Sequence, residues 1–101
     1  MSDAEFAGQI ALVTGASRGI GRAIAMQLLA KGATVIGTAT TEVGAQAIGE
    51  ALQAAVPGAS RGLRLDVTDA AAVEAAMDEL LKMHGGLHVL VNNAGITRDT
   101  L

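Results

Sequence analysis

Cysteine, tryptophan and tyrosine are absent from this chain of 101 residues, and phenylalanine and proline each occur once. Without cysteine there can be no disulfide bond, no thiolate nucleophile and no cysteine-based metal site. Half of the sequence is hydrophobic, but only 1% is aromatic. The core must therefore be built almost entirely from aliphatic side chains. Such a core suits a parallel α/β sheet better than an aromatic-cored β-sandwich.

Positive charge is scarce as well: 7 lysines and arginines face 10 aspartates and glutamates, for a net charge of -3. Because the basic residues are scattered, they form neither a stripe for nucleic acid nor a polybasic run for a membrane surface. No uncharged apolar run approaches the roughly 20 residues that cross a bilayer. Residues 1–8 are polar and acidic, unlike a signal peptide. We therefore expect a cytoplasmic protein without nucleic-acid or membrane partners.

Four apolar, β-branched runs recur at nearly even spacing, over residues 9–14, 33–38, 62–65 and 88–92. Between them, residues 19–31, 43–55 and 70–84 show the apolar spacing of helices. Strand alternating with helix predicts βαβ units and a parallel sheet. Right-handed crossovers would place the first two helices on one face and the third on the other, with strand order 3-2-1-4. The predicted fold class is α/β, with residues 1–101 as the N-terminal part of one Rossmann-type doubly wound domain.

Each predicted helix carries an apolar stripe expected to face the sheet. The stripes comprise Ile20, Ile24 and Leu28, then Ala47, Ile48, Ala51 and Leu52, then Val73, Met77, Leu80 and Leu81. Gly32 and Gly85 follow the first and third helices as C-terminal caps. Thr68 or Asp69 caps the start of the third. Gly49 costs its helix up to about 1 kcal/mol relative to alanine, so it is either a tolerated exception or a point of close packing.

A glycine-rich segment joins the first strand to the first helix. It reads Thr14-Gly15-Ala16-Ser17-Arg18-Gly19-Ile20-Gly21. The pyrophosphate of a dinucleotide needs bare backbone N–H groups and the positive end of a helix. We expect Gly15 to turn the chain, Gly19 to leave room for the phosphates and Gly21 to allow close packing. The segment fits T-G-x-x-x-G-x-G, and its place between a strand and a helix favours a dinucleotide site over a glycine turn without ligand.

The end of the second strand indicates which dinucleotide is bound. NAD-binding folds usually place an acid there for the ribose hydroxyls, whereas here no acid occurs before Glu42. A carboxylate would repel a 2′-phosphate, so its absence admits one. Arg18 can pair with that phosphate, and Thr40 and Thr41 supply hydroxyl donors. We predict NADPH over NADH, with a solvated surface arginine as the alternative for Arg18.

Two further motifs follow the third and fourth strands. Asp66 could accept a hydrogen bond from the adenine amino group and Val67 could offer an apolar contact, although a simple turn carboxylate is the alternative. The fourth strand is followed by Asn92-Asn93-Ala94-Gly95. Two adjacent amides can tie neighbouring strand backbones together, and Ala94 and Gly95 keep the loop thin enough for a cofactor ribose.

Together, the three motifs resemble the short-chain dehydrogenase/reductase family, over essentially the whole chain from Gly8 onward. One branch of this family uses NADPH to reduce 3-oxoacyl thioesters on acyl carrier protein in fatty-acid synthesis. The sequence is most similar to that branch over residues 10–25, 35–40 and 92–99. The resemblance implies a homotetramer. The residues expected at the cofactor are Gly15, Ala16, Ser17, Arg18, Gly19, Ile20, Gly21, Thr40, Asp66, Val67, Asn93, Ala94 and Gly95.

The family's catalytic serine, its Tyr-x-x-x-Lys pair and a further asparagine lie beyond the fourth-strand loop, and this chain has no tyrosine. The reaction needs a phenol to protonate the developing alkoxide. We therefore expect no catalytic residue within residues 1–101, and a chain that is inactive by itself. Because of an open sheet edge and uncovered apolar area, we expect a chain that is poorly stable, oligomeric through that surface, or only part of a longer protein.

Three alternatives stay open. The parent could be another family member, either an acetoacetyl-CoA reductase or an alcohol or sugar dehydrogenase. From a different class, the chain could be a nucleotide-binding module without catalysis.

No metal site is expected, because His84 and His88 lack the remaining ligands of a two-histidine metal site. We interpret both as ordinary surface residues.

Overall fold

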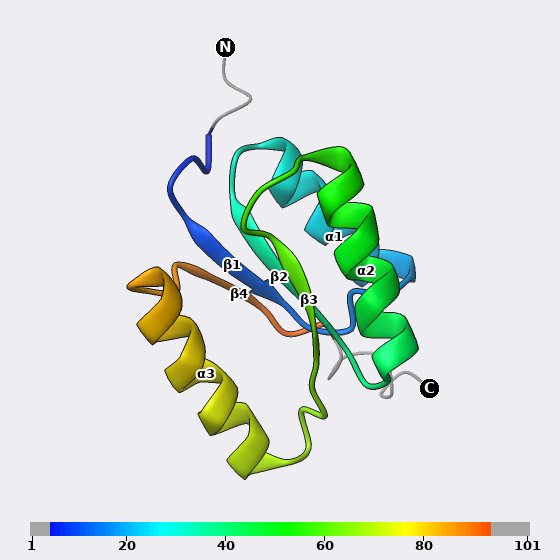
Figure 1. The fold of residues 1–101 in the computed structure, drawn as a ribbon, viewed down its shortest axis with the longest axis vertical. Helices are drawn as coiled ribbons and strands as arrows, with labels where there is room; N and C mark the ends of the chain where they lie inside the picture. The colour runs from blue at the N-terminus through cyan, green and yellow to red at the C-terminus, as the bar shows by residue number, and fades with distance from the viewer. Residues whose placement is uncertain (1–4, 94–101) are drawn as a thin grey trace.

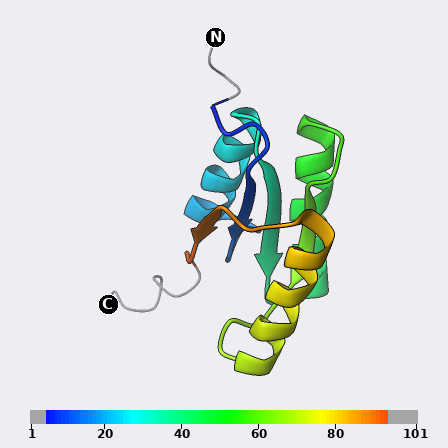
Figure 2. The ribbon, with the colours of Figure 1, turned by 90° about the vertical axis from the view of Figure 1, so that its left-hand side faces the viewer.

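The computed structural model describes residues 5–93. Within them, strands and helices alternate as β1 Ile10–Val13, α1 Gly19–Ala30, β2 Thr34–Ala39, α2 Glu42–Ala55, β3 Arg61–Arg64, α3 Ala70–His84 and β4 Val89–Val91. The sheet has the order β3-β2-β1-β4, and every neighbouring pair is parallel. α1 and α2 cover one face and α3 the other (Figures 1 and 2). The predicted fold class and strand order are confirmed, and each predicted element boundary lies within one residue of the observed one.

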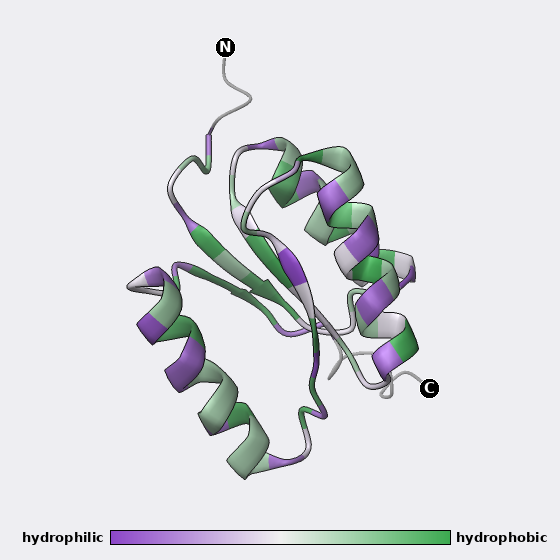
Figure 3. Ribbon diagram, viewed as in Figure 1, coloured by the Kyte–Doolittle hydropathy of each residue, from purple (hydrophilic) through white to green (hydrophobic). Residues whose placement is uncertain are grey.

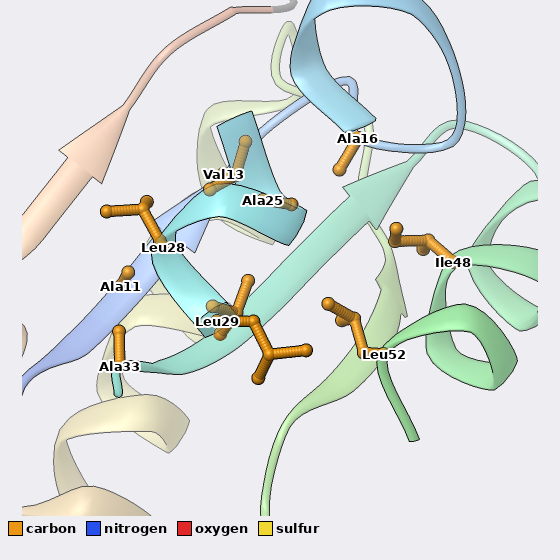
Figure 4. Packing of buried hydrophobic residues seen from close by; sticks show 10 residues of the cluster. Ala11, Val13, Ala16, Ala25, Leu28, Leu29, Ala33, Ile48 and Leu52 are labelled. Carbon is orange, nitrogen blue, oxygen red and sulfur yellow. The ribbon is translucent and has the colours of Figure 1, made fainter. Parts of the chain in front are cut away.

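The core has two layers, one on each face of the sheet. The larger cluster joins β1 and β2 to α1 and α2 and includes Val13, Ala25, Leu29, Ile48 and Leu52 (Figure 4). The smaller cluster, on the α3 face, comprises Leu12, Ile36 and Leu80. β1 is buried along its whole length, as expected for a central parallel strand covered on both faces. Its apolar residues stand out in the hydropathy view, while polar residues mark the outer sides of the helices (Figure 3).

Parts of the predicted stripes lie at the surface instead. The side chain of Ile20 is 73% exposed and that of Leu81 is 48% exposed, and Ala47 is exposed as well. Ile20 lies beside the buried stripe of α1, which is formed by Gly21, Ala25, Leu28 and Leu29. Leu81 lies beside the buried stripe of α3, which is formed by Ala76 and Leu80.

α2 and β3 approach each other at a pair of glycines. A Cβ on Gly62 would overlap the carbonyl oxygen of Ala45, and one on Gly49 would lie 3.1 Å from the backbone nitrogen of Gly62. Gly49 is therefore a point of close packing, which is the second of its two interpretations. This contact packs α2 closely against β3 at the edge of the sheet.

The helix ends follow the predicted signals. Asp69 caps α3, because its Oδ1 accepts a hydrogen bond of 3.1 Å from the N–H of Ala72. Gly32 and Gly85 have left-handed φ angles of 102° and 79° just after α1 and α3, a region that glycine enters without steric cost. None of the helices in the described range combines the length and apolar character needed to span a membrane.

Polar side chains that sequence reasoning did not assign close the turn between α2 and β3. The hydroxyl of the buried Ser60 accepts the N–H of Val35 at 2.8 Å, one residue before β3 begins to pair with β2. The side-chain amide of Gln53 donates to the carbonyl oxygens of Gly58, at 2.8 Å, and of Ser60. The Ser60 hydroxyl thereby satisfies a buried N–H of β2 just before the pairing with β3 begins. The Gln53 bonds hold the more exposed part of the turn.

The two histidines are more structural than predicted. His88 Nδ1 accepts the N–H of Ile10 at 3.0 Å, while the N–H of His88 donates to the carbonyl oxygen of Ile10 at 2.9 Å. His88 thereby extends the pairing of β1 with β4 by one residue. His84 is half-buried rather than exposed. His88 is exposed, as expected, but it also satisfies a backbone group of β1. The expectation of a surface residue is therefore corrected only for His84.

Candidate cofactor-binding site

The glycine-rich loop is tied to strands on both sides of β1. The N–H of Thr14 donates to the carbonyl oxygen of Val91 at 3.0 Å, and the N–H of Ala16 donates to that of Thr38 at 2.8 Å. Between these anchors, Gly15 has a φ of 61°, and Gly19 has a φ of 65° where α1 begins. Because other residues adopt such angles only under strain, both glycines are required by the backbone path.

The fourth-strand motif contacts this loop directly. Asn93 is 8% exposed, and its Nδ2 donates to the carbonyl oxygen of Gly15 at 3.2 Å. A Cβ on Gly21 would overlap that same carbonyl oxygen and lie 2.7 Å from Asn93 Nδ2. Gly21 therefore allows close packing, as predicted, but the group it packs against is the loop and Asn93.

The neighbouring asparagine holds the start of the loop. The hydroxyl of Thr14 donates to Asn92 Oδ1 at 3.2 Å and to the carbonyl oxygen of Val91 at 3.4 Å. Together with the Asn93 contact, this means that the two adjacent amides join the end of β4 to the end of β1. The predicted tie between neighbouring strands is thus present, and it acts on the loop itself.

The N-terminus of α1 is open. Arg18 occupies the N-cap position in an extended conformation, its side chain caps no backbone group, and the first turn contains no acid. Arg18, Gly19 and Ile20 are exposed, and apart from its chain neighbours and the backbone of α1 no described atom lies within 4 Å of the position of a Cβ on Gly19. The unpaired N–H groups of a first helical turn carry partial positive charge. This end of α1 can therefore accept an anion such as a phosphate.

The loop also rests on the end of β2. A Cβ on Gly37 would lie 3.1 Å from the Cβ of Ala16 and 2.9 Å from Cγ1 of Ile48. The backbone of β2 therefore passes directly beneath the loop and beside α2. As a consequence, the residues that follow β2 emerge next to the residues that open α1.

Thr41 has a role that sequence reasoning missed. Its Oγ1 accepts the N–H of Gly44 at 3.0 Å, so it is the N-cap of α2. The sequence did contain a signal for this N-cap, because Thr41 lies two residues before the predicted helical pattern and threonine is a favoured N-cap residue. A Cβ on Gly44 would lie 3.4 Å from the Cβ of Ser17, so the start of α2 adjoins the loop. The preceding Thr40 is exposed.

Asp66 follows β3 at the same edge of the sheet. Its Oδ1 accepts the hydroxyl of Thr68 at 2.6 Å and the N–H of Thr68 at 2.9 Å. The hydroxyl bond of Thr68 and then its backbone bond lower the pKa of Asp66. Desolvation opposes this change, and the nearby charge of Arg64 adds a weaker lowering effect. Both bonds go to one oxygen and match the turn carboxylate that was the alternative for Asp66. They do not occupy Oδ2.

Val67 is half-buried and lines a cavity of about 140 Å³ beside α3, together with Thr14 and Asn92.

The predicted site residues follow the carboxyl ends of strands that point the same way (Figure 1). They are the residues of the glycine-rich loop, Thr40, Asp66, Val67 and Asn93. Ala94 and Gly95 lie outside the described residues. The remaining predicted site residues therefore share one edge of the sheet, where ligands bind in doubly wound folds.

Comparison with known proteins gives the family. The family model described as short chain dehydrogenase matches residues 9–101. The 3-oxoacyl-[acyl-carrier-protein] reductase of Escherichia coli is 58% identical over 96 residues, which cover 95% of this chain and 38% of that protein. The reductase of the same name from Vibrio harveyi is 57% identical over 94 residues, covering 93% of this chain and 37% of that protein. The reductase of the same name from Pseudomonas aeruginosa is 54% identical over 95 residues, which cover 93% of this chain and 38% of that protein.

This chain thus spans less than two fifths of the length of these curated relatives. The matched region contains the glycine-rich loop, the end of β2 and both asparagines after β4. The chain belongs to the short chain dehydrogenase family.

Proposed function

We propose that this chain is the NADPH-binding part of an enzyme that reduces 3-oxoacyl thioesters on acyl carrier protein to 3-hydroxyacyl thioesters, as in fatty-acid synthesis. The observation that carries the cofactor half of this proposal is the open N-terminus of α1 beneath a loop with two left-handed glycines. The carrier-protein substrate is proposed from the likeness to relatives that bear that name.

The loop and the first turn of α1 would hold the pyrophosphate. Backbone N–H groups at the start of α1 have no side-chain cap, and no other segment of the described structure comes within 4 Å of the position of a Cβ on Gly19. A phosphate there would receive hydrogen bonds from the backbone and the favourable end of the helix dipole. Asn93, through Gly15, would keep this cradle in shape before the ligand arrives.

The 2′-phosphate of NADPH would lie at the turn after β2. The residues from Gly37 to Thr41 contain no acid, and this turn adjoins the loop at Ser17. Arg18 is exposed and caps nothing, so its guanidinium is available for a phosphate. Adenine would lie toward Asp66 and Val67, after β3.

When bound, NADPH supplies the hydride, and the residues of this chain hold and orient it. A proton donor to the developing alkoxide is also required. The chain has no tyrosine, so we place the catalytic acid in the remaining part of the parent polypeptide and expect residues 1–101 to be inactive alone. A homo-oligomeric assembly and a cytoplasmic location belong to the same proposal.

The test is steady-state oxidation of NADPH by the full-length parent polypeptide with acetoacetyl-acyl carrier protein, acetoacetyl-CoA, and a panel of sugars and alcohols. We expect the largest kcat/KM for the carrier-protein thioester. A larger kcat/KM for the CoA thioester would indicate an acetoacetyl-CoA reductase instead. Tight NADPH binding without turnover of any substrate would indicate a nucleotide-binding module.

A further inference from the structure

Arg64 contacts the turn where the 2′-phosphate is proposed to bind. It is the last residue of β3, paired with Ala39 in the register with β2. Its Nε donates a hydrogen bond of 3.3 Å to the carbonyl oxygen of Thr40. Since Arg64 is exposed, its guanidinium lies at the surface of this turn, where a ligand can reach it.

Side chains of β3 alternate between the two faces of the sheet, and this alternation places Arg64 on the face covered by α2. Gly62 faces α2, because a Cβ on it would overlap the carbonyl oxygen of Ala45. Leu63 packs against the cluster on the opposite, α3 face. Side chains two residues apart on a strand share a face, so Arg64 lies on the α2 side with Gly62. It is thus directed toward the start of α2.

The glycine-rich loop reaches the same place from the other direction. A Cβ on Gly44 would lie 2.9 Å from the Cβ of Ala39, 3.2 Å from Oγ1 of Thr41 and 3.4 Å from the Cβ of Ser17. The turn after β2 therefore lies between the loop, with Arg18, and the end of β3, with Arg64. A group bound on this turn would meet a guanidinium from each side.

The charges around Arg64 leave it available to an anion. Its Nε is used by Thr40, which leaves the four terminal N–H donors of the guanidinium. The carboxylates near it are Asp66, whose Oδ1 is already bonded to Thr68, and Glu42 in the first turn of α2. Neither forms an ion pair within 4.0 Å of Arg64 in the described structure.

We propose that Arg64 is a second recognition residue for the 2′-phosphate, opposite Arg18, and that it increases the preference of this site for NADPH over NADH. This inference rests on the proposed function. A guanidinium anchored through Nε presents its remaining donors with little loss of side-chain freedom on binding, which favours a planar contact to phosphate oxygens.

The test compares adenosine 2′,5′-bisphosphate with 5′-AMP, two probes that differ in the 2′-phosphate, by calorimetric titration of the intact polypeptide. Arg64→Met should weaken binding of the bisphosphate by about tenfold or more, the value of a charge-assisted hydrogen bond. It should leave 5′-AMP unchanged. Arg61→Met is the matched control: it makes the same change of charge on the same strand, but at the end remote from the turn.

A purely structural role for Arg64 predicts something else. Loss of the bond to Thr40 would then weaken both probes equally, or lower Tm without changing the ratio of the two dissociation constants, and either result overturns the inference. If Arg64→Met does not fold, Arg64→Lys carries the test, because lysine keeps the charge but loses the planar fork. It should lower the bisphosphate preference partly, and an unchanged preference overturns the inference.

The same titration separates this inference from the proposed function. Wild-type protein that binds adenosine 2′,5′-bisphosphate no more tightly than 5′-AMP contradicts the proposed NADPH preference before any variant is made. Wild-type preference that survives Arg64→Met contradicts the role of Arg64 alone.

Discussion

The amide nitrogen of Asn93 lies 3.2 Å from the carbonyl oxygen of Gly15, across 78 residues of sequence. This bond attaches the end of β4 to the first turn of the loop after β1. Gly21 completes the contact from α1, since it leaves space for both groups. Three separate segments thus determine the shape of the loop, and each contributes one residue that can be changed alone.

Asn93→Asp should damage the loop, whereas Asn92→Asp should not. At position 93 the change replaces a donor with a charged acceptor facing the carbonyl oxygen of Gly15, and the lost bond should cost about 1–3 kcal/mol of unfolding free energy. Asn92 accepts from the Thr14 hydroxyl through Oδ1, and aspartate keeps that acceptor. Urea denaturation of both variants measures the difference. Equal losses would show that the Asn93 amide is not the group that matters.

Gly21→Ala should displace α1 or Asn93, because the added Cβ would overlap the carbonyl oxygen of Gly15. Overpacking of this kind costs about 1–3 kcal/mol, and NADPH affinity should fall with it. Gly86→Ala is the control, since a Cβ there would meet only His88, at an ordinary 3.6 Å. Melting temperature and NADPH titration report the two effects. An alanine at position 21 that changes neither would contradict the close packing described for this glycine.

The glycine pair between α2 and β3 should respond unequally to alanine. Gly62→Ala adds a Cβ that overlaps the backbone of Ala45, so α2 must move, and we expect a loss of about 1–3 kcal/mol. For Gly49→Ala, a gain of about 1 kcal/mol in helix propensity opposes a tight contact of 3.1 Å. Its net effect should be close to zero. Chemical denaturation ranks the two, and a larger loss for Gly49→Ala would reverse the account.

Asp66 should contribute stability only above acidic pH. Its folded-state pKa is lowered below the usual 3.8, chiefly by the Thr68 hydroxyl. A carboxyl with a depressed folded pKa stabilises the protein above its unfolded pKa and loses that contribution as pH falls through the folded value. The stability difference between wild type and Asp66→Asn should therefore be constant near neutral pH and shrink below about pH 4.

Thr68→Val tests the cause of that shift. Valine removes the hydroxyl and keeps the backbone N–H, so the pKa of Asp66 should rise toward its ordinary value, as followed by NMR titration of the carboxyl carbon. Thr68→Ser keeps the hydroxyl and should preserve the lowered pKa. If valine leaves the titration unchanged, the backbone bond and Arg64 must dominate.

The fold was predictable because the signals were local. Alternating apolar runs and helical stripes gave the elements, and the right-handed crossover rule gave the strand order. The glycines of the loop were recognised for the same reason, since a left-handed φ or a close approach limits the choice of residue at a single position. Gly21 was predicted to allow close packing, but its partners were not, because Asn93 is distant in the sequence.

Tertiary contacts explain what sequence reasoning missed. Whether Ile20 is buried depends on which side of α1 faces the sheet, and the apolar spacing does not determine this to a single residue. Ser60, Gln53 and His88 satisfy backbone groups at strand ends, and those ends depend on register. Arg64 was unremarkable in sequence, because its contact with Thr40 exists only when β2 and β3 are paired.

The loop after β1 and the acid-free turn after β2 are proposed to form an NADPH site. Calorimetric titration of the full-length parent polypeptide with NADPH and with NADH, at one pH and ionic strength, is the decisive experiment. NADPH should bind about tenfold or more tightly than NADH, since a charge-assisted bond to the 2′-phosphate is worth about 1.5–3 kcal/mol. Equal or tighter binding of NADH would contradict the proposed site.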